Sequence, residues 1–158
     1  MGTQAAFQYR NEADADKAAV VRETFAEVER LLNAHDPASE LSLLAKLDDS
    51  EILQRCDSLV RPCYEAAFRH RDLSGRVFNP RWKGEGTMDL GAIAKGYAVD
   101  LAAQRIGSCD AIIDLGGNIK ALGGVWKIGV FGADDVLALH EGEACATSGE
   151  YFRGEHIK

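Results

Sequence analysis

The chain has 158 residues, of which 46% are hydrophobic and 27% charged, and its formal net charge is -7. This length allows one domain with a sizeable core, and the composition is that of a soluble globular protein, which excludes disordered and membrane-spanning classes. The negative charge argues against nonspecific binding to nucleic acid or anionic membranes, because both favour a basic surface.

The first residues of the chain lack the basic and apolar regions of a signal peptide, and no apolar run is long enough to cross a bilayer. The chain as written is therefore expected in the cytoplasm. If a leader has been removed from a longer precursor, a periplasmic or membrane-anchored protein is expected instead. The four cysteines form no Cys-x-x-Cys pair and are expected to be small buried hydrophobes: Cys56, Cys63, Cys109 and Cys145.

One short strand and a series of helices are expected in the first half of the chain. Residues 5–9 fit a strand, and residues 14–32 carry apolar side chains at helical spacing. Ser39 stands directly before a short apolar pattern and is expected to cap a helix. Residues 50–56 and 58–70 predict two further helices, which Pro62 keeps from forming a single one.

Residues 88–100 carry the clearest functional pattern. Apolar residues lead to Asp89, a turn follows at Gly91, and the helical pattern then runs past Lys95 to about Ile106. We expect a strand end, a turn and a helix whose first N–H groups and dipole face a phosphate, with Lys95 adding charge. Asp89 could accept from sugar hydroxyls or help hold a cation. An ordinary strand-turn-helix corner with a surface lysine explains the spacing equally well.

The second half of the chain is predicted to be rich in strands. Residues 111–114 form a buried-type strand, residues 119–122 and 125–131 are expected to form a hairpin through Gly123 and Gly124, and residues 136–140 are a further strand. Two Asp-Leu-Gly turns, at residues 89–91 and 114–116, could meet over one site. The expected fold class is α+β, with a mixed, largely antiparallel sheet and helices packed on it, in one domain over residues 1–158.

Four stretches, in this order, carry a family resemblance. They are Ser39-Glu40-Leu41-Ser42, the run Asp-Leu-Gly-Ala-Ile-Ala-Lys-Gly-Tyr-Ala-Val-Asp at 89–100, Asp114-Leu115-Gly116-Gly117-Asn118-Ile119, and Ala146-Thr147-Ser148-Gly149-Glu150-Tyr151. Together they resemble the FAD:protein FMN transferases, the ApbE-type flavin transferases. Met-Gly-Thr at 1–3 and the turn at 75–80 are similar to further motifs of that family.

The resemblance implies transfer of FMN from FAD to a threonine hydroxyl of a target flavoprotein, with Mg²⁺ as cofactor. His156 would be the base for the acceptor threonine, and the backbone carbonyl of Ala92 would be a metal ligand. Two of the implied FAD contacts depart from the family, because His35 replaces a tyrosine and Asn79 an aspartate. The implied FAD-binding residues are Met1, His35, Phe78, Asn79, Asp89, Lys95, Thr147 and Ser148.

The chain also departs from the family in length. Only residues 81–88 connect the turn at 75–80 to the central stretch. Trp82 in this connection could cover a flavin edge, although a lone tryptophan more often packs within the fold. The remaining metal ligands of the family would lie beyond Lys158. Weak metal binding is therefore expected from this chain alone, and a second copy could supply the missing pocket wall in a homo-oligomer. Two alternatives stay open: a degenerate module that binds flavin without transferring it, and an α/β domain whose glycine turns are structural.

Overall fold

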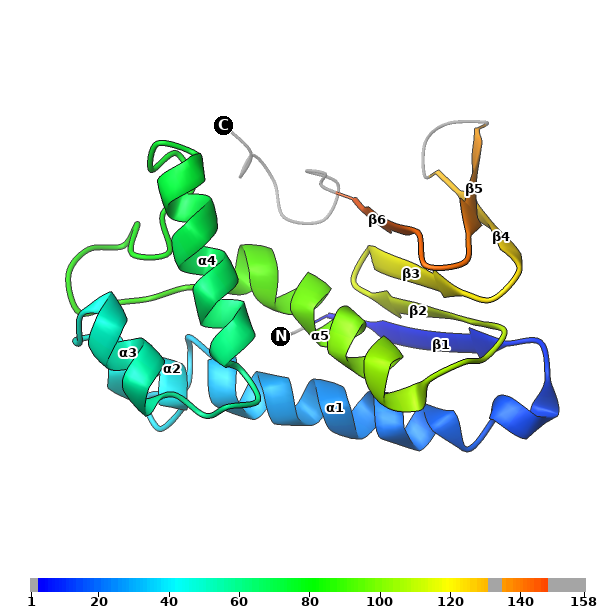
Figure 1. Cartoon of the computed structure of the whole chain (residues 1–158), viewed down its shortest axis with the longest axis horizontal. Coiled ribbons are helices and arrows are strands. Elements are labelled where there is room, and N and C mark those ends of the chain that lie inside the picture. The colour runs from blue at the N-terminus through cyan, green and yellow to red at the C-terminus, as the bar shows by residue number, and fades with distance from the viewer. Residues whose placement is uncertain (1–2, 131–134, 148–158) are drawn as a thin grey trace.

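The computed structural model describes residues 3–130 and 135–147 and has an α+β fold (Figure 1). The predicted fold class is confirmed, and helices precede most of the strands as expected. In chain order the elements are β1 (Ala5–Tyr9), a 3-10 turn η1 (Glu12–Asp14), α1 (Lys17–Leu32), α2 (Glu40–Leu44), α3 (Asp49–Arg55), α4 (Arg61–Leu73), α5 (Gly91–Ile106), β2 (Ala111–Leu115), β3 (Asn118–Leu122), β4 (Val125–Gly129), β5 (Val136–His140) and β6 (Ala144–Ala146).

The described strands form two antiparallel sheets. The main sheet has the order β1-β2-β3-β6, and β4 pairs with β5 in a second sheet. In the main sheet Ala5 lies opposite Leu115, Leu115 opposite Asn118, and Asn118 opposite Ala146. The start of β1, the end of β2, the start of β3 and the end of β6 therefore lie side by side at one end of the sheet.

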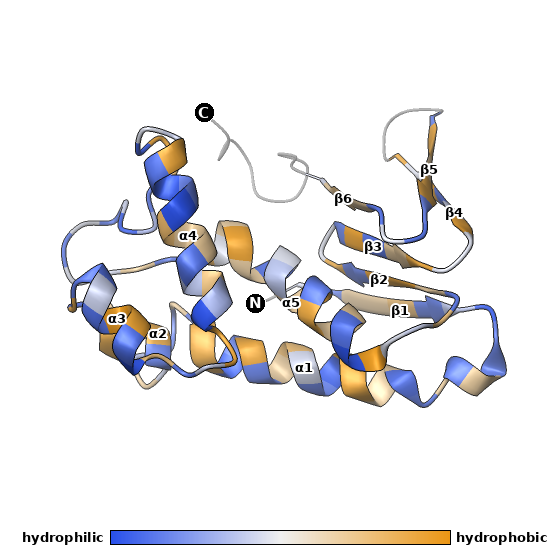
Figure 2. Cartoon of the chain, in the orientation of Figure 1, coloured by the Kyte–Doolittle hydropathy of each residue, from blue (hydrophilic) through white to orange (hydrophobic). Residues whose placement is uncertain are grey.

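Helices cover one face of the main sheet. Side chains alternate between the two faces of a strand, so Ile113 and Leu115 of β2 point into the core with the helices. Small buried residues of α5, such as Ala98 and Ala102, allow α1 to pack closely against it. Figure 2 shows hydrophobic segments alternating with hydrophilic ones along α1, as expected of an amphipathic helix with one buried face.

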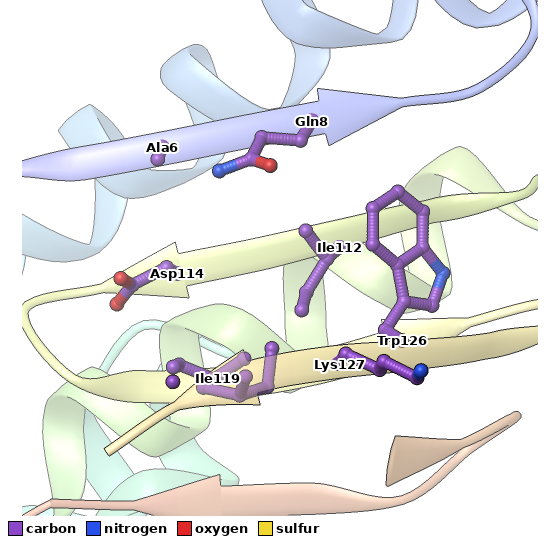
Figure 3. A pocket seen from close by; sticks show the side chains of 9 residues that line it. Ala6, Gln8, Ile112, Asp114, Ile119, Trp126 and Lys127 are labelled. Carbon is purple, nitrogen blue, oxygen red and sulfur yellow. The ribbon is translucent and has the colours of Figure 1, made fainter. Parts of the chain in front are cut away.

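A half-open hollow of about 230 Å³ lies between the other face of the main sheet and β4 (Figure 3). Ile112, Asp114 and Trp126 are among the residues that line it. Arg10 joins the two sheets on one side of it, since its guanidinium lies 4.2 Å from the Trp126 ring centroid and donates to the Asp110 carboxylate at 3.0 Å. The β4–β5 sheet is therefore fixed to the main sheet at one edge and leaves this space beside it.

Local signals at the helix starts are confirmed. The Ser39 hydroxyl accepts a hydrogen bond from the backbone N–H of Ser42 at 3.2 Å and so caps α2. Pro62 lies in the first turn of α4, where its missing N–H leaves no intrahelical bond unmade. Within the described residues no helix is long and apolar enough to cross a membrane.

Two predictions of local structure are wrong. No strand leads directly into α5: Met88 and Leu90 are buried in the core, and the Asp89 N–H donates to the Pro80 carbonyl at 2.8 Å instead of to a neighbouring strand. β3 and β4 also form no hairpin through Gly123 and Gly124. Both edges of β3 are taken by β2 and β6, so the two glycines carry the chain from one sheet to the other.

Candidate functional site

The start of α5 is capped by the carboxylate of Asp89. Asp89 Oδ1 accepts from the Gly91 N–H at 2.9 Å, and Oδ2 lies 3.3 Å from Lys83 Nζ. A Cβ atom on Gly91 would approach Asp89 Oδ1 to 3.0 Å, so glycine leaves room for this cap. Asp89 is therefore held by one backbone donor and one ammonium group, and Lys83 balances its charge.

One donor at this helix start remains free. The N–H groups of Ile93 and Ala94 donate to the Leu90 carbonyl, and that of Gly91 to Asp89. Ala92 is exposed, and its N–H makes no hydrogen bond with the described residues. A free N–H in the first turn of a long helix suits an anion, because the helix dipole adds to the attraction.

Lys95 lies on the same side of α5 as Ala92, since residues three apart are neighbours on a helix surface. Its side chain is half-buried and makes no hydrogen bond or ion pair with residues 3–130 or 135–147. A half-buried ammonium group without a partner costs free energy that an anion would recover. The Ala92 N–H and Lys95 thus lie on one side of the first turns of α5, where a phosphate could bind.

The end of the main sheet brings further polar groups to α5. Thr147 donates its N–H to the Gly117 carbonyl at 2.9 Å, and a Cβ atom on Gly116 would overlap the Thr3 hydroxyl. A Cβ atom on Gly96 would lie 3.9 Å from Asn118 Oδ1, so this end of the sheet faces the residue that follows Lys95. Thr147 was predicted as a site residue, whereas Thr3 and Asn118 belonged to matching stretches without an assigned role.

The turn at 75–80 also lies against the start of α5. Phe78 is half-buried and packs against the core, and Asn79 uses its Oδ1 to accept from the Arg81 N–H at 2.9 Å. The Pro80 carbonyl accepts from Asp89 and holds the turn in place. The structure thus places Phe78 and Asn79 near Asp89, although the Asn79 carbonyl oxygen is already engaged.

Other predicted residues are not brought to this place. His35 is exposed after α1, and no hydrogen bond or ion pair joins its side chain to the other candidates within the described residues. Asp114 lies on the far face of β2, where it lines the hollow between the sheets and accepts from the Gly117 N–H at 2.8 Å. The Asp114 carboxylate therefore does not join Asp89 at the start of α5. Met1, Ser148 and His156 lie outside the described residues.

The described residues do not build a metal site by themselves. They contain no group of three or more His, Cys, Asp or Glu side chains that could hold a metal ion. Ala92, the predicted ligand, offers a carbonyl in the first turn of α5, and the nearby carboxylate of Asp89 is already engaged. Mg²⁺ needs several oxygen ligands in octahedral geometry, so these residues alone do not fit it.

The cysteines are not reactive groups of this site. Cys56 and Cys63 are buried as predicted, whereas Cys109 and Cys145 are only half-buried. Burial raises the pKa of the Cys63 thiol to about 12 and also raises the pKa of the other three thiols. The thiolate is the reactive form, so these side chains act as small hydrophobes.

Glu40, in the first matching stretch, makes a contact whose effect on stability depends on pH. Its Oε2 accepts from the Asp57 N–H at 2.7 Å, while Oε1 and the Tyr64 hydroxyl are buried without a hydrogen-bond partner within the described residues. Burial, and to a lesser degree the charge of Asp57, raises the pKa of Glu40 above its usual 4.5. The folded state therefore favours the protonated form of Glu40. This effect adds to the free energy of unfolding at low pH, and the contribution is lost as the pH rises through the raised pKa of Glu40.

We expect Glu40→Gln to raise the free energy of unfolding by roughly 1 kcal/mol at about pH 8, because it removes a buried charge and keeps an acceptor for Asp57. The gain should shrink as pH falls and vanish below about pH 4.5, where Glu40 is also neutral. Urea unfolding across this pH range measures it. Glu65→Gln, on the exposed face of α4, is the control and should change nothing; a loss of stability in Glu40→Gln at about pH 8 contradicts the argument.

Known proteins share the part of this sequence that carries α5 and the glycine turns. Residues 81–156 match the ApbE family. Over 78 residues, 42% of this chain, the sequence is 37% identical to an FAD:protein FMN transferase of Rhodobacter capsulatus, and the match spans 15% of that relative's length. The resemblance predicted from the sequence is therefore confirmed, and it is concentrated in the half of the chain that holds α5 and the glycine turns.

Two solved structures have the same fold as this chain. The flavin transferase ApbE from Vibrio cholerae superposes with a TM-score of 0.75 over 100% of this chain and 71% of its own. A histidine-to-glycine mutant of that protein gives 0.76 over 96% of this chain and 68% of its own. At 18% sequence identity these similarities establish the fold alone.

Proposed function

We propose, on the premise that this chain is similar to the ApbE flavin transferases over residues 81–156, that it binds FAD and transfers FMN to a protein. The observation that carries the proposal is that the Lys95 ammonium and the Ala92 N–H, three residues apart at the start of α5, have no partner among residues 3–130 and 135–147. The diphosphate of FAD is the anion that this pair would bind. The finer proposal is that the acceptor is a threonine hydroxyl of a target flavoprotein.

In this reaction the threonine oxygen attacks the phosphorus of the FMN half of FAD, and the bond to the bridging oxygen breaks. The products are an FMN phosphoester of threonine and AMP, and the hydroxyl proton is released. Negative charge on the phosphoryl oxygens is what a catalyst must stabilise, and the proposal assigns this role to Lys95 and the Ala92 N–H. His156 remains the proposed base for the hydroxyl.

Mg²⁺ is part of the proposal through the family resemblance only. When bound to a diphosphate, a divalent ion neutralises the phosphate oxygens. Because the described residues do not supply its ligands, we assign it no step. We also propose that a second copy of the chain supplies the missing wall of the site in a homo-oligomer.

A flavin-binding module without transferase activity is the second candidate. It is favoured by Asp89, whose two carboxylate oxygens already contact Gly91 and Lys83, and by the lack of a cluster of metal-binding side chains among the described residues. Such a module would hold FAD or FMN at the same place on α5. The two candidates differ only in whether the phosphorus–oxygen bond is broken.

Mass spectrometry of an acceptor flavoprotein tests the proposal. The acceptor is incubated with the full chain, FAD and Mg²⁺, and a matched acceptor with alanine in place of the threonine is the control. A gain of the FMN mass on the threonine acceptor alone supports transfer. Calorimetric binding of FAD without an adduct supports the module, and absence of any FAD binding overturns both.

A further inference from the structure

Trp82 is an exposed aromatic residue close to the proposed FAD site. It lies in the connection between α4 and α5, and 66% of its surface is exposed. The ammonium of Lys83 lies 5.0 Å from the centroid of its ring, within the range of a cation–π contact. A largely exposed indole ring can offer a flat face to another flat ring.

Lys83 connects this ring to the start of α5. The same ammonium that lies over Trp82 lies 3.3 Å from Asp89 Oδ2, and Asp89 Oδ1 accepts from the first N–H of the helix. An uncompensated carboxylate at this point would repel a diphosphate brought to the free N–H of Ala92. Lys83 reduces that repulsion, and its ammonium links the Trp82 ring to the helix start.

We infer that Trp82 and Lys83 form a wall of the FAD site, a role that the sequence did not assign to Lys83. Trp82 stacks on one of the two flat rings of the dinucleotide, and Lys83 is a positioning residue that neutralises Asp89 for the diphosphate. Stacking between a base and an aromatic side chain is favourable for any flat heterocycle. This inference rests on the proposed binding of FAD at α5.

The tryptophan content allows a direct test of stacking, because Trp82 and Trp126 are the only two tryptophans of the chain. Trp126 lies on the far side of the main sheet, beside the hollow, so Trp126→Phe is the matched control for Trp82→Phe. Bound flavin is excited with visible light, which tryptophan does not absorb. An indole in contact with the isoalloxazine quenches flavin emission, whereas phenylalanine does not.

We expect bound flavin to be several-fold brighter in Trp82→Phe than in Trp126→Phe if the isoalloxazine stacks on Trp82. If the adenine stacks there instead, saturating ADP should change the tryptophan emission of Trp126→Phe, in which Trp82 alone remains. Either result supports the inference. Equal flavin emission in both variants, with no response to ADP while calorimetry shows bound FAD, overturns it.

The role of Lys83 is tested by its dependence on Asp89. Lys83→Met should raise the dissociation constant for FAD about tenfold at low salt, and Lys83→Arg should stay within about threefold of the unmodified protein. In an Asp89→Asn background, which keeps an oxygen for the helix cap, the same Lys83→Met change should cost less than about twofold. An equal penalty in both backgrounds means that Lys83 does not act through Asp89.

The proposed binding of FAD and the proposed wall of Trp82 and Lys83 can fail separately. If the unmodified chain binds no FAD, the proposed function is overturned together with this inference. If it binds FAD and the Trp82 and Lys83 variants all behave like the unmodified chain, only the wall of the site is wrong. Circular dichroism of each variant checks that the exposed substitutions leave the fold intact.

Discussion

Replacing Lys95 by methionine is expected to weaken FAD binding by at least about tenfold, the effect of losing one close charge pair with the diphosphate. The ammonium has no partner within the described residues, so its charge is available to a ligand rather than to the fold. Methionine keeps most of the length and the apolar stem, so stability should change little. Calorimetric titration with FAD measures the loss, and raising the salt concentration should reduce it.

Two variants control the Lys95 result. Lys95→Arg keeps the charge and should recover most of the affinity, whereas Lys127→Met removes an exposed lysine from β4 and should leave FAD binding unchanged. If Lys127→Met weakens binding as much as Lys95→Met, the effect comes from net charge alone. Unchanged affinity in Lys95→Met would show that α5 does not bind the diphosphate.

Gly123→Ala is expected to destabilise the fold by about 3 kcal/mol, from left-handed backbone strain and a steric clash. Gly123 has a φ of +69°, and a Cβ atom there would lie 2.6 Å from the Cys109 carbonyl oxygen and 3.1 Å from Asp110 Cα. Both neighbours are backbone atoms of the two residues before β2, so neither can move away by a change of rotamer. Urea unfolding followed by circular dichroism measures the loss.

Gly142→Ala separates the two causes. Gly142 also has a positive φ, +80°, but a Cβ atom there would meet nothing within 4 Å. Its replacement should therefore cost only the backbone strain, about 1 kcal/mol. Equal losses at both positions would show that the crossing between the two sheets is not as tight as the structure has it.

The prediction from sequence was accurate where a signal is local. Apolar residues at helical spacing marked α1, the Ser39 cap marked the start of α2, and the strand predicted at 136–140 is β5 with the same bounds. The matching stretches placed the candidate site on α5, where an N–H group and a lysine have no partner in the part of the chain that the structure describes. These features depend on residues that are close in the chain.

The prediction failed where distant residues decide the outcome. Met88 and Leu90 have the apolar character of a strand, but they point into a core built by other helices, and no strand pairs with them. Gly123 and Gly124 carry a hairpin signal, but both neighbours of β3 are other strands. Strand pairing depends on which strand edges the rest of the chain leaves open. The residues of the turn alone do not determine this.

The sequence by itself determined the order and type of most elements, the α+β class and the resemblance to the ApbE family, because periodicity and motifs are properties of short segments. Only the tertiary structure decided that Asp114 faces away from α5, that Asp89 is engaged by Lys83 and Gly91, and that Lys95 has no partner within the described residues. The charge and burial of a side chain depend on atoms supplied by other segments, and packing alone brings those atoms together.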